Sequence, residues 1–422
     1  MNMSKVFKSS LGIKYPTLRD HPLHSGLKWL EGKTYDDGAE GLWRIHDNLY
    51  DLRAFIDRHP GGRDWIQLTK GTDITEAFES HHLHSTPVEI LKTFYVKKAS
   101  KPRNFPFTFN EKGFYKTLKR RITEKVATLP KQPAIRSAYI ADVMLVTYLC
   151  TYFLAVYLKS LVLGFISGIC LALLAIIAHN FFHKKDNFRR YYFDLCMMSS
   201  KEWRISHVLS HHMYTNTISD MEISSLEPFL QYLPGEKNML VRYGSWLYSP
   251  VIFAVLFFGH YIKTLISDYK NVSWTYILPF VPLVLTWCFL NQSTLCCLSF
   301  FFWIITVASI YFGIVGTNAA HHHPEIFHDG DSSRNPELDW GIFQLVAVMD
   351  RKDITGSHFL VLTNFGDHAL HHLFPTIDHG LLEHLYPVFL ETCKEFDLEW
   401  RLESQIELVK GQYMQLARMN CN

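Results

Sequence analysis

The stretch LVLGFISGICLALLAIIAHNFFH, residues 161–183, joins an apolar run of membrane length to two closely spaced histidines. Residues 161–178 carry no charged side chain and are long enough, as a helix, to cross a hydrocarbon core of about 30 Å. His179 and His183 follow at positions i and i+4, so both imidazoles project from one face of a helix. The stretch therefore predicts a membrane span that ends in a pair of metal ligands.

Three more apolar runs have membrane length, namely residues 138–158, 274–290 and 295–317. Only Lys159 and Ser160 separate the first of them from residues 161–178, which predicts a transmembrane hairpin, and the short NQST segment joins the other two into a second hairpin. Basic residues crowd the outer ends of the first hairpin, where the positive-inside rule places the cytosol. They are Arg136, Lys184, Lys185, Arg189 and Arg190. The sequence therefore predicts four spans, with both termini in the cytosol.

A fifth apolar run, residues 246–264, is rich in aromatic side chains and contains His260 and Lys263. These features favour a helix that lies in the membrane interface. The alternative is a fifth span. It would place the histidines after residue 317 on the opposite side of the membrane from those before residue 246, so they could not share metal ions.

The composition excludes several classes of protein. The 422 residues are 48% hydrophobic, enough for two or three domains or for a membrane protein. Lys and Arg number 42 against 40 Asp and Glu, so the net charge of +2 gives no reason to expect a nucleic-acid partner. The eight cysteines show no CxxC spacing, which predicts reduced packing residues. The opening MNMSKVFKSSLGIKYPT has no apolar core, so no cleavable signal peptide is expected.

Up to about residue 100 the chain has no apolar run near membrane length, which predicts a soluble domain. Within it, DLRAFIDRHPGGRDWIQLTKGTDITEAFESHHLHS resembles the haem-binding core of cytochrome b5. After His59, the residues Pro-Gly-Gly force a turn and let the backbone approach a flat cofactor closely. The resemblance implies haem b with His59 as one axial ligand.

The second haem ligand comes from the HHLH sequence that follows Phe78. Related fused domains favour His82, with His84 or His81 as the alternatives. Two imidazoles would fill both axial positions of the iron, so the haem is expected to carry electrons rather than to bind oxygen.

Histidines recur in two further groups, HVLSHH at residues 207–212 and HALHH at residues 368–372. On a helix His207 and His211 share a face, while His212 lies about 100° further round and reaches a second metal. Many neutral imidazoles around two ions fit a di-iron centre better than an oxygen-rich magnesium or calcium site, and a structural zinc ion needs only four ligands.

These groups resemble the three histidine boxes of membrane fatty acid desaturases, over roughly residues 137–400, and DHALHHLFPTIDH is close to the third box. In the acyl-CoA desaturases an Asn and a His one turn apart complete the metal shell, which implies Asn318 and His322 here, with His321 and His323 as alternatives. The resemblance thus implies two non-haem iron ions. The implied ligands are His179, His183, His207, His211, His212, His322, His368, His371 and His372. Candidates to orient their imidazoles are Asp186, Asp220, Asp367 and Asp378.

Both halves together resemble the cytochrome b5–fatty acid desaturase fusion family, including insect proteins described as cytochrome b5-related. This implies an α+β cytochrome b5-like haem domain followed by an all-α multi-span membrane desaturase domain with a cytosolic histidine-box cap. The predicted divisions are an N-terminal extension (1–24), the haem domain (25–100), a basic linker (101–136) and the desaturase domain (137–422).

The resemblance implies an endoplasmic reticulum enzyme that uses O2 to desaturate an acyl-CoA or acyl-lipid. NADH would act indirectly, through NADH-cytochrome b5 reductase, and the tethered haem would pass electrons to the di-iron centre. The chain departs from front-end desaturases, whose third box usually begins with Gln, because it has His368 there. The alternatives are a fatty acid or sphingolipid hydroxylase, and a haem electron-transfer protein with an inactive desaturase fold.

Overall fold

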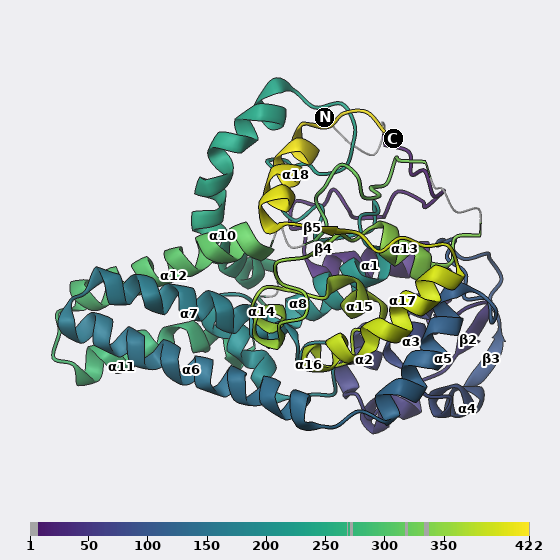
Figure 1. Cartoon of the computed structure of the whole chain (residues 1–422), viewed down its shortest axis with the longest axis horizontal. Helices are drawn as coiled ribbons and strands as arrows, with labels where there is room; N and C mark the ends of the chain where they lie inside the picture. Colours follow the sequence, from purple (N-terminus) through teal and green to yellow (C-terminus); the bar gives the residue numbers. More distant parts are fainter. Residues whose placement is uncertain (1–6, 268, 271–272, 317–319, 333–336, 422) are drawn as a thin grey trace.

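A computed structural model describes residues 7–267, 269–270, 273–316, 320–332 and 337–421 of the chain. Long helices form a bundle at one end of the molecule and a small mixed domain forms the other end (Figure 1). Short helices that carry or flank the histidine boxes lie between these two parts. They are α8 (Ser200–Trp203), α14 (His358–Thr363), α15 (His368–Leu373) and α16 (His379–Leu382).

The mixed domain contains a three-stranded antiparallel sheet with the order β1-β2-β3. Trp43, Ile45 and Leu52 belong to its own small buried core. Gly62 has a φ of +118°, which a residue without a Cβ adopts readily, and this lets the HPGG turn lead directly into a helix. The elements are α1 (Gly26–Asp36), β1 (Trp43–Ile45), β2 (Asn48–Tyr50), η2 (Arg53–Arg58), α2 (Arg63–Leu68), α3 (Thr75–His81), α4 (Thr86–Lys92) and β3 (Tyr95–Lys98).

The bundle contains the predicted transmembrane hairpins. The first is α6 (Gln132–Leu158) and α7 (Leu161–His179), which Lys159 joins in a left-handed conformation. The second is η6 (Trp274–Phe280) with α11 (Val281–Phe289), followed by α12 (Thr294–Gly316). Gly168 of α7 brings the two hairpins close together, because a Cβ there would lie 2.6 Å from Val307. Many outward side chains of the bundle are exposed and apolar, as a lipid-facing surface requires.

Helix α10 (Ser245–Ser267) covers the ambiguous fifth run and follows a π-helical turn, η5 (Leu240–Gly244). Among the residues that the structure describes, four helical segments are long and apolar enough to cross a membrane. They are Gln132–Leu158, Leu161–His179, Leu240–Ser267 and Thr294–Gly316. By this measure α10 qualifies, whereas the predicted third span is a shorter apolar segment, Trp274–Phe289.

The arrangement of α10 nevertheless supports a helix in the interface. Its first part runs across the direction of α6, α7 and α12, which lie along the long axis of the molecule (Figure 1). The shorter segment is mostly 3-10 helix in its first half, and its combined rise of roughly 27 Å is close to a hydrocarbon thickness of about 30 Å. The choice of η6 and α11 as the third span therefore stays a prediction.

The predicted basic linker contains a packed helix, α5 (Phe114–Ala127). Phe114 and Leu118 are buried in the largest core of the protein. Lys116 and Lys119 form ion pairs with Glu79 of α3, at 2.8 and 3.3 Å. The basic side chains of this helix thus hold the haem domain in place, in addition to any contact with a membrane surface.

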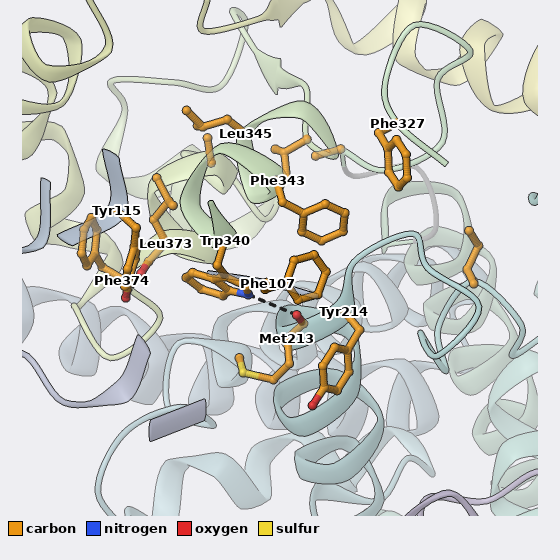
Figure 2. Close-up of a cluster of buried hydrophobic side chains, with 14 of the residues drawn as sticks. Phe107, Tyr115, Met213, Tyr214, Phe327, Trp340, Phe343, Leu345, Leu373 and Phe374 are labelled. Carbon is orange, nitrogen blue, oxygen red and sulfur yellow. Dashed lines mark hydrogen bonds between the residues drawn. The ribbon is translucent and has the colours of Figure 1, made fainter. Parts of the chain in front are cut away.

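The largest core also fixes the second and third boxes relative to each other (Figure 2). Met213 and Tyr214 directly follow the second box, and Leu373 and Phe374 complete and follow α15. The Trp340 indole N–H, from α13 (Trp340–Val346), donates to the Met213 carbonyl at 3.2 Å.

The remaining elements are η3 (Phe188–Cys196), η4 (Arg204–His211), α9 (His212–Tyr214), β4 (Asp350–Arg351), η7 (Glu383–Leu385), α17 (Tyr386–Glu395), β5 (Leu402–Glu403) and α18 (Gln405–Ala417), with β4 and β5 pairing in parallel.

Candidate metal and haem sites

Five buried histidines from all three boxes converge between the bundle and the haem domain. Each offers one ring nitrogen, and these nitrogens all lie within 4.8 Å of one another. The Nε2 atom of His179 lies 2.8 Å from His207 Nε2 and 2.9 Å from His371 Nε2. This first group consists of His179, His183, His207, His212 and His371.

A second group of four buried histidines lies beside the first. Its members are His211, His321, His368 and His372. The Nε2 atom of His368 lies 2.7 Å from His321 Nε2 and 3.2 Å from His372 Nε2. The rings of His212 and His372 stack with centroids 4.0 Å apart, so the two groups are in direct contact.

A π-helical turn distributes the second box over both groups. Residues Arg204–His211 form η4, and the N–H of His212 donates to the carbonyl of His207, five residues earlier. In such a turn residues i and i+5 lie on similar faces. His207 and His212 therefore enter the first group and His211 enters the second. The expected pairing of His207 with His211 is observed as well, because their rings stack with centroids 5.3 Å apart and both residues lie beside Glu222.

Side-chain oxygens fix the orientation of several of these rings. Each accepts a hydrogen bond from an imidazole Nδ1 when that nitrogen is protonated, and this directs Nε2 into the group. The pairs are His207–Glu222, His211–Asp220 and His372–Gln344, each with 2.9 Å between Nδ1 and the oxygen. These partners favour one tautomer, in which Nε2 is a free electron donor.

The two groups fit metal ions better than a hydrogen-bonded core. Both ring nitrogens of His183 are buried without a hydrogen-bond partner among the described residues, which is costly unless a metal binds there. Burial lowers the pKa of His183, His212 and His371 well below the usual range, so these rings are neutral ligands. A buried set of nine imidazoles suits redox-active iron more than magnesium or calcium.

The haem domain brings two imidazoles to opposite sides of a gap. The ring centroids of His59 and His82 are 6.2 Å apart, which leaves room for one iron atom bonded to both at about 2 Å. His59 Nδ1 lies 2.9 Å from the Gly62 carbonyl, and His82 Nδ1 lies 2.9 Å from the Phe78 carbonyl. Both Nε2 atoms are thereby left as donors to the iron, so these residues fit a haem.

The two alternative haem ligands have other positions. His84 is exposed and follows the end of α3. His81 has its Nδ1 at 3.0 Å from the Ala77 carbonyl, and its ring stacks on His183 rather than facing His59. The geometry therefore supports His82 as the second ligand.

Replacing His82 with alanine should abolish the low-spin, bis-imidazole haem spectrum of the full-length protein, because it removes one of the two axial nitrogens. His84→Ala should leave this spectrum unchanged, because its side chain is exposed. Visible absorption of the two purified variants distinguishes the candidates. Loss of the spectrum in the His84 variant alone would show that the chosen ligand is wrong.

Comparison with protein families identifies the two domains that contain these sites. The model described as Fatty acid desaturase matches residues 155–404, more than half of the chain. The chain belongs to the fatty acid desaturase family. The model described as Cytochrome b5-like Heme/Steroid binding domain matches residues 28–100. The predicted fusion and fold class, a cytochrome b5-like domain followed by a helical desaturase domain, are thus confirmed.

Among relatives, the chain is 42% identical to "Cytochrome b5-related protein" of Drosophila melanogaster, with 98% of this chain and 97% of the relative aligned. It is 25% identical to "Probable Delta(5) fatty acid desaturase C" of Dictyostelium discoideum, over 89% of this chain and 91% of the relative. "Acyl-lipid (8-3)-desaturase" of Mortierella alpina is 22% identical, over 88% and 92%. No solved structure matches.

In this member of the desaturase family, the ligand predicted after the fourth span needs a correction. His321, not His322, lies in the second group. The His322 ring instead stacks on Tyr232, with centroids 3.6 Å apart and planes at 6°. Asn318, its predicted companion, lies outside the described residues.

The sequence also left several site residues unrecognised. The ring of His379 lies 4.4 Å from that of His371, and its Nδ1 lies 2.9 Å from Asn180 Oδ1. His379 ends the DHALHHLFPTIDH motif, so its position was the available signal. Of the four predicted aspartates, Asp220 alone is hydrogen-bonded to a grouped imidazole in the part of the chain that the structure describes. The other three contact different partners, in the pairs Asp186–Arg204, Asp367–Tyr386 and Asp378–Lys184.

Proposed function

We propose that this protein is an O2-dependent lipid acyl-chain desaturase, in which the haem domain delivers electrons to two iron ions held by the histidine groups. The observation that carries the proposal is a cavity of about 530 Å³ that both groups border. His207 of the first group and His211, His321 and His368 of the second line its wall. An acyl chain in this cavity would lie directly beside the iron.

The cavity has the character of an acyl-binding site. Its walls come from the second box segment, residues 220–232, α10 and the end of α12. Apolar side chains dominate it, and they include Trp203, Phe229, Ile252, Val255, Leu256 and Phe312. Polar groups such as Lys263 and His24 also line it, where they can orient the polar end of a substrate.

The residues of the chain perform the supporting steps. The grouped imidazoles hold the ions, and Asp220, Glu222 and Gln344 keep their rings oriented. The apolar wall excludes water and positions the acyl chain next to the ligands. Iron bound in the two groups supplies the O2 chemistry.

Several finer assignments belong to this proposal. Relatives described as acyl-lipid desaturases support an acyl-lipid or acyl-CoA substrate, and the four apolar helices support a membrane location, which we assign to the endoplasmic reticulum with the boxes in the cytosol. Electrons would come from NADH through NADH-cytochrome b5 reductase to haem b on His59 and His82. Two electrons, two protons, O2 and two acyl hydrogens would then give one double bond and two molecules of water.

Product analysis tests the reaction class. Membranes that contain the protein, supplied with NADH, the reductase and O2, should form acyl chains with one additional double bond. Gas chromatography with mass spectrometry of the fatty acids detects this change, and anaerobic membranes are the control. Products that carry an added oxygen instead of a double bond would show that the enzyme is a hydroxylase and not a desaturase. An unchanged profile, with iron and haem present, would contradict both.

Filling the cavity should slow the reaction without disturbing the metals. Gly259 of α10 lines the cavity, and a Cβ there would meet nothing within 4 Å. Gly259→Phe should lower acyl turnover at least about fivefold, because its ring competes with the substrate for space. Gly259→Ala is the matched control and should keep the turnover of the unchanged protein. Iron and haem content should stay constant in both variants, and equal turnover would show that the substrate binds elsewhere.

A further inference from the structure

His81 lies between the haem site and the first histidine group. It is the last residue of α3 and directly precedes His82, the haem ligand. On its other side its ring stacks on that of His183, with centroids 5.9 Å apart and planes at 29°. Its Nε2 atom is buried without a hydrogen-bond partner within the described ranges. One side chain thus connects the two candidate redox sites.

The hydrogen bonds of His81 keep its ring in this position. Its Nδ1 lies 3.0 Å from the Ala77 carbonyl and 3.0 Å from Ser80 Oγ. Trp65 lies beside the ring as well, with centroids 6.1 Å apart. A ring fixed in this way presents a constant face to His183.

The haem domain itself is docked against the desaturase domain around His81. The Arg204 guanidinium lies over the Trp65 ring at 4.5 Å and forms an ion pair with Asp186 at 2.8 Å. The HPGG loop fits closely against the same carboxylate, because a Cβ on Gly62 would lie 2.6 Å from an Asp186 oxygen. With the two ion pairs of Glu79, these contacts fix the distance between the domains.

We propose that His81 is the bridging residue through which electrons pass from the haem at His82 to the iron at His183. The inference rests on the proposed function, since it requires a haem and bound iron. In each transfer a ferrous haem loses one electron and becomes ferric, and a ferric ion of the first group gains that electron and becomes ferrous. His81 neither gains nor loses a proton, and the reductase reduces the haem again before the second transfer.

Haem reoxidation measures this step directly. The full-length protein, loaded with haem and ferric iron in lipid nanodiscs, is mixed without O2 with the reductase and limiting NADH, and the haem is followed by absorbance. His81→Leu should slow reoxidation at least about tenfold, whereas His81→Phe, which keeps an aromatic ring, should remain closer to the unchanged protein. His84→Leu, an exposed position in the same segment, is the matched control. The haem spectrum and iron content should not change.

Each outcome decides the inference. Reoxidation of His81→Leu within about twofold of the unchanged protein, with both metals present, would overturn it and leave the desaturase proposal intact. No reoxidation in the unchanged protein despite bound iron would instead contradict electron delivery itself, and the inference with it. If His81→Leu loses haem or iron, His81→Gln takes its place, because it lacks a ring but retains an amide that can bond to the Ala77 carbonyl.

Discussion

Replacing His371 with alanine should remove the non-haem iron and lower acyl desaturation at least about 100-fold, with the haem spectrum and haem reduction unchanged. The Nε2 atom of His371 lies 2.9 Å from that of His179, and its ring contacts those of His183 and His212. Losing this imidazole opens the first group at its centre. Iron per chain, the rate of haem reduction and the fatty acid profile are the three measurements.

A matched control is His384→Ala, which changes a partly exposed histidine in the same region and outside both groups. It should keep iron and activity. If the His371 variant retains its iron, or if its lipid profile equals that of the unchanged protein, the enzyme assignment fails. The chain would then be a haem protein on an inactive desaturase fold.

Replacing His59 with alanine should have the opposite effect. The haem should be lost and NADH-supported turnover should fall at least about 100-fold, because no axial ligand remains on that side of the haem. The iron content should stay constant, since His59 contacts neither histidine group in the described structure. Arg58→Ala, an exposed neighbour, is the control. Full NADH-dependent activity without haem would show that electrons reach the iron by another route.

Much of the fold could be predicted from the sequence because its signals are local. Each signal occupies a short stretch of sequence that predicts one structure. These stretches are the apolar runs of α6, α7 and α12, the HPGG turn and the three boxes. The third span was harder. Its helix begins as a 3-10 segment, and the neighbouring α10 is longer and apolar, so length and hydropathy alone favour α10 as the span. The orientation of α10 across the bundle favours η6 and α11 instead, and their assignment as the third span stays a prediction.

The site residues that the sequence did not identify depend on tertiary contacts. The three histidines at 321–323 are identical in type and differ only in the direction in which each side chain projects. Because His322 packs against Tyr232, His321 is the one that enters the second group. Glu222 and Gln344 belong to no motif, and their role depends on folding beside His207 and His372. The lysines of α5 were predicted only as part of a basic linker, because their partner, Glu79, lies far away in the sequence.

The π-helical turn of η4 makes the site sensitive to the register of the chain. His212 lies five positions after His207, and this interval matches the hydrogen bond between their backbones. Deleting one residue between them, such as Leu209, would keep every histidine, the net charge and the hydropathy profile. The imidazoles of His207 and His212 would nevertheless project from different faces of the helix. One metal ion would then lose a ligand, and that ligand would face the other ion. For this box, insertions and deletions are more damaging than most substitutions of its spacer residues.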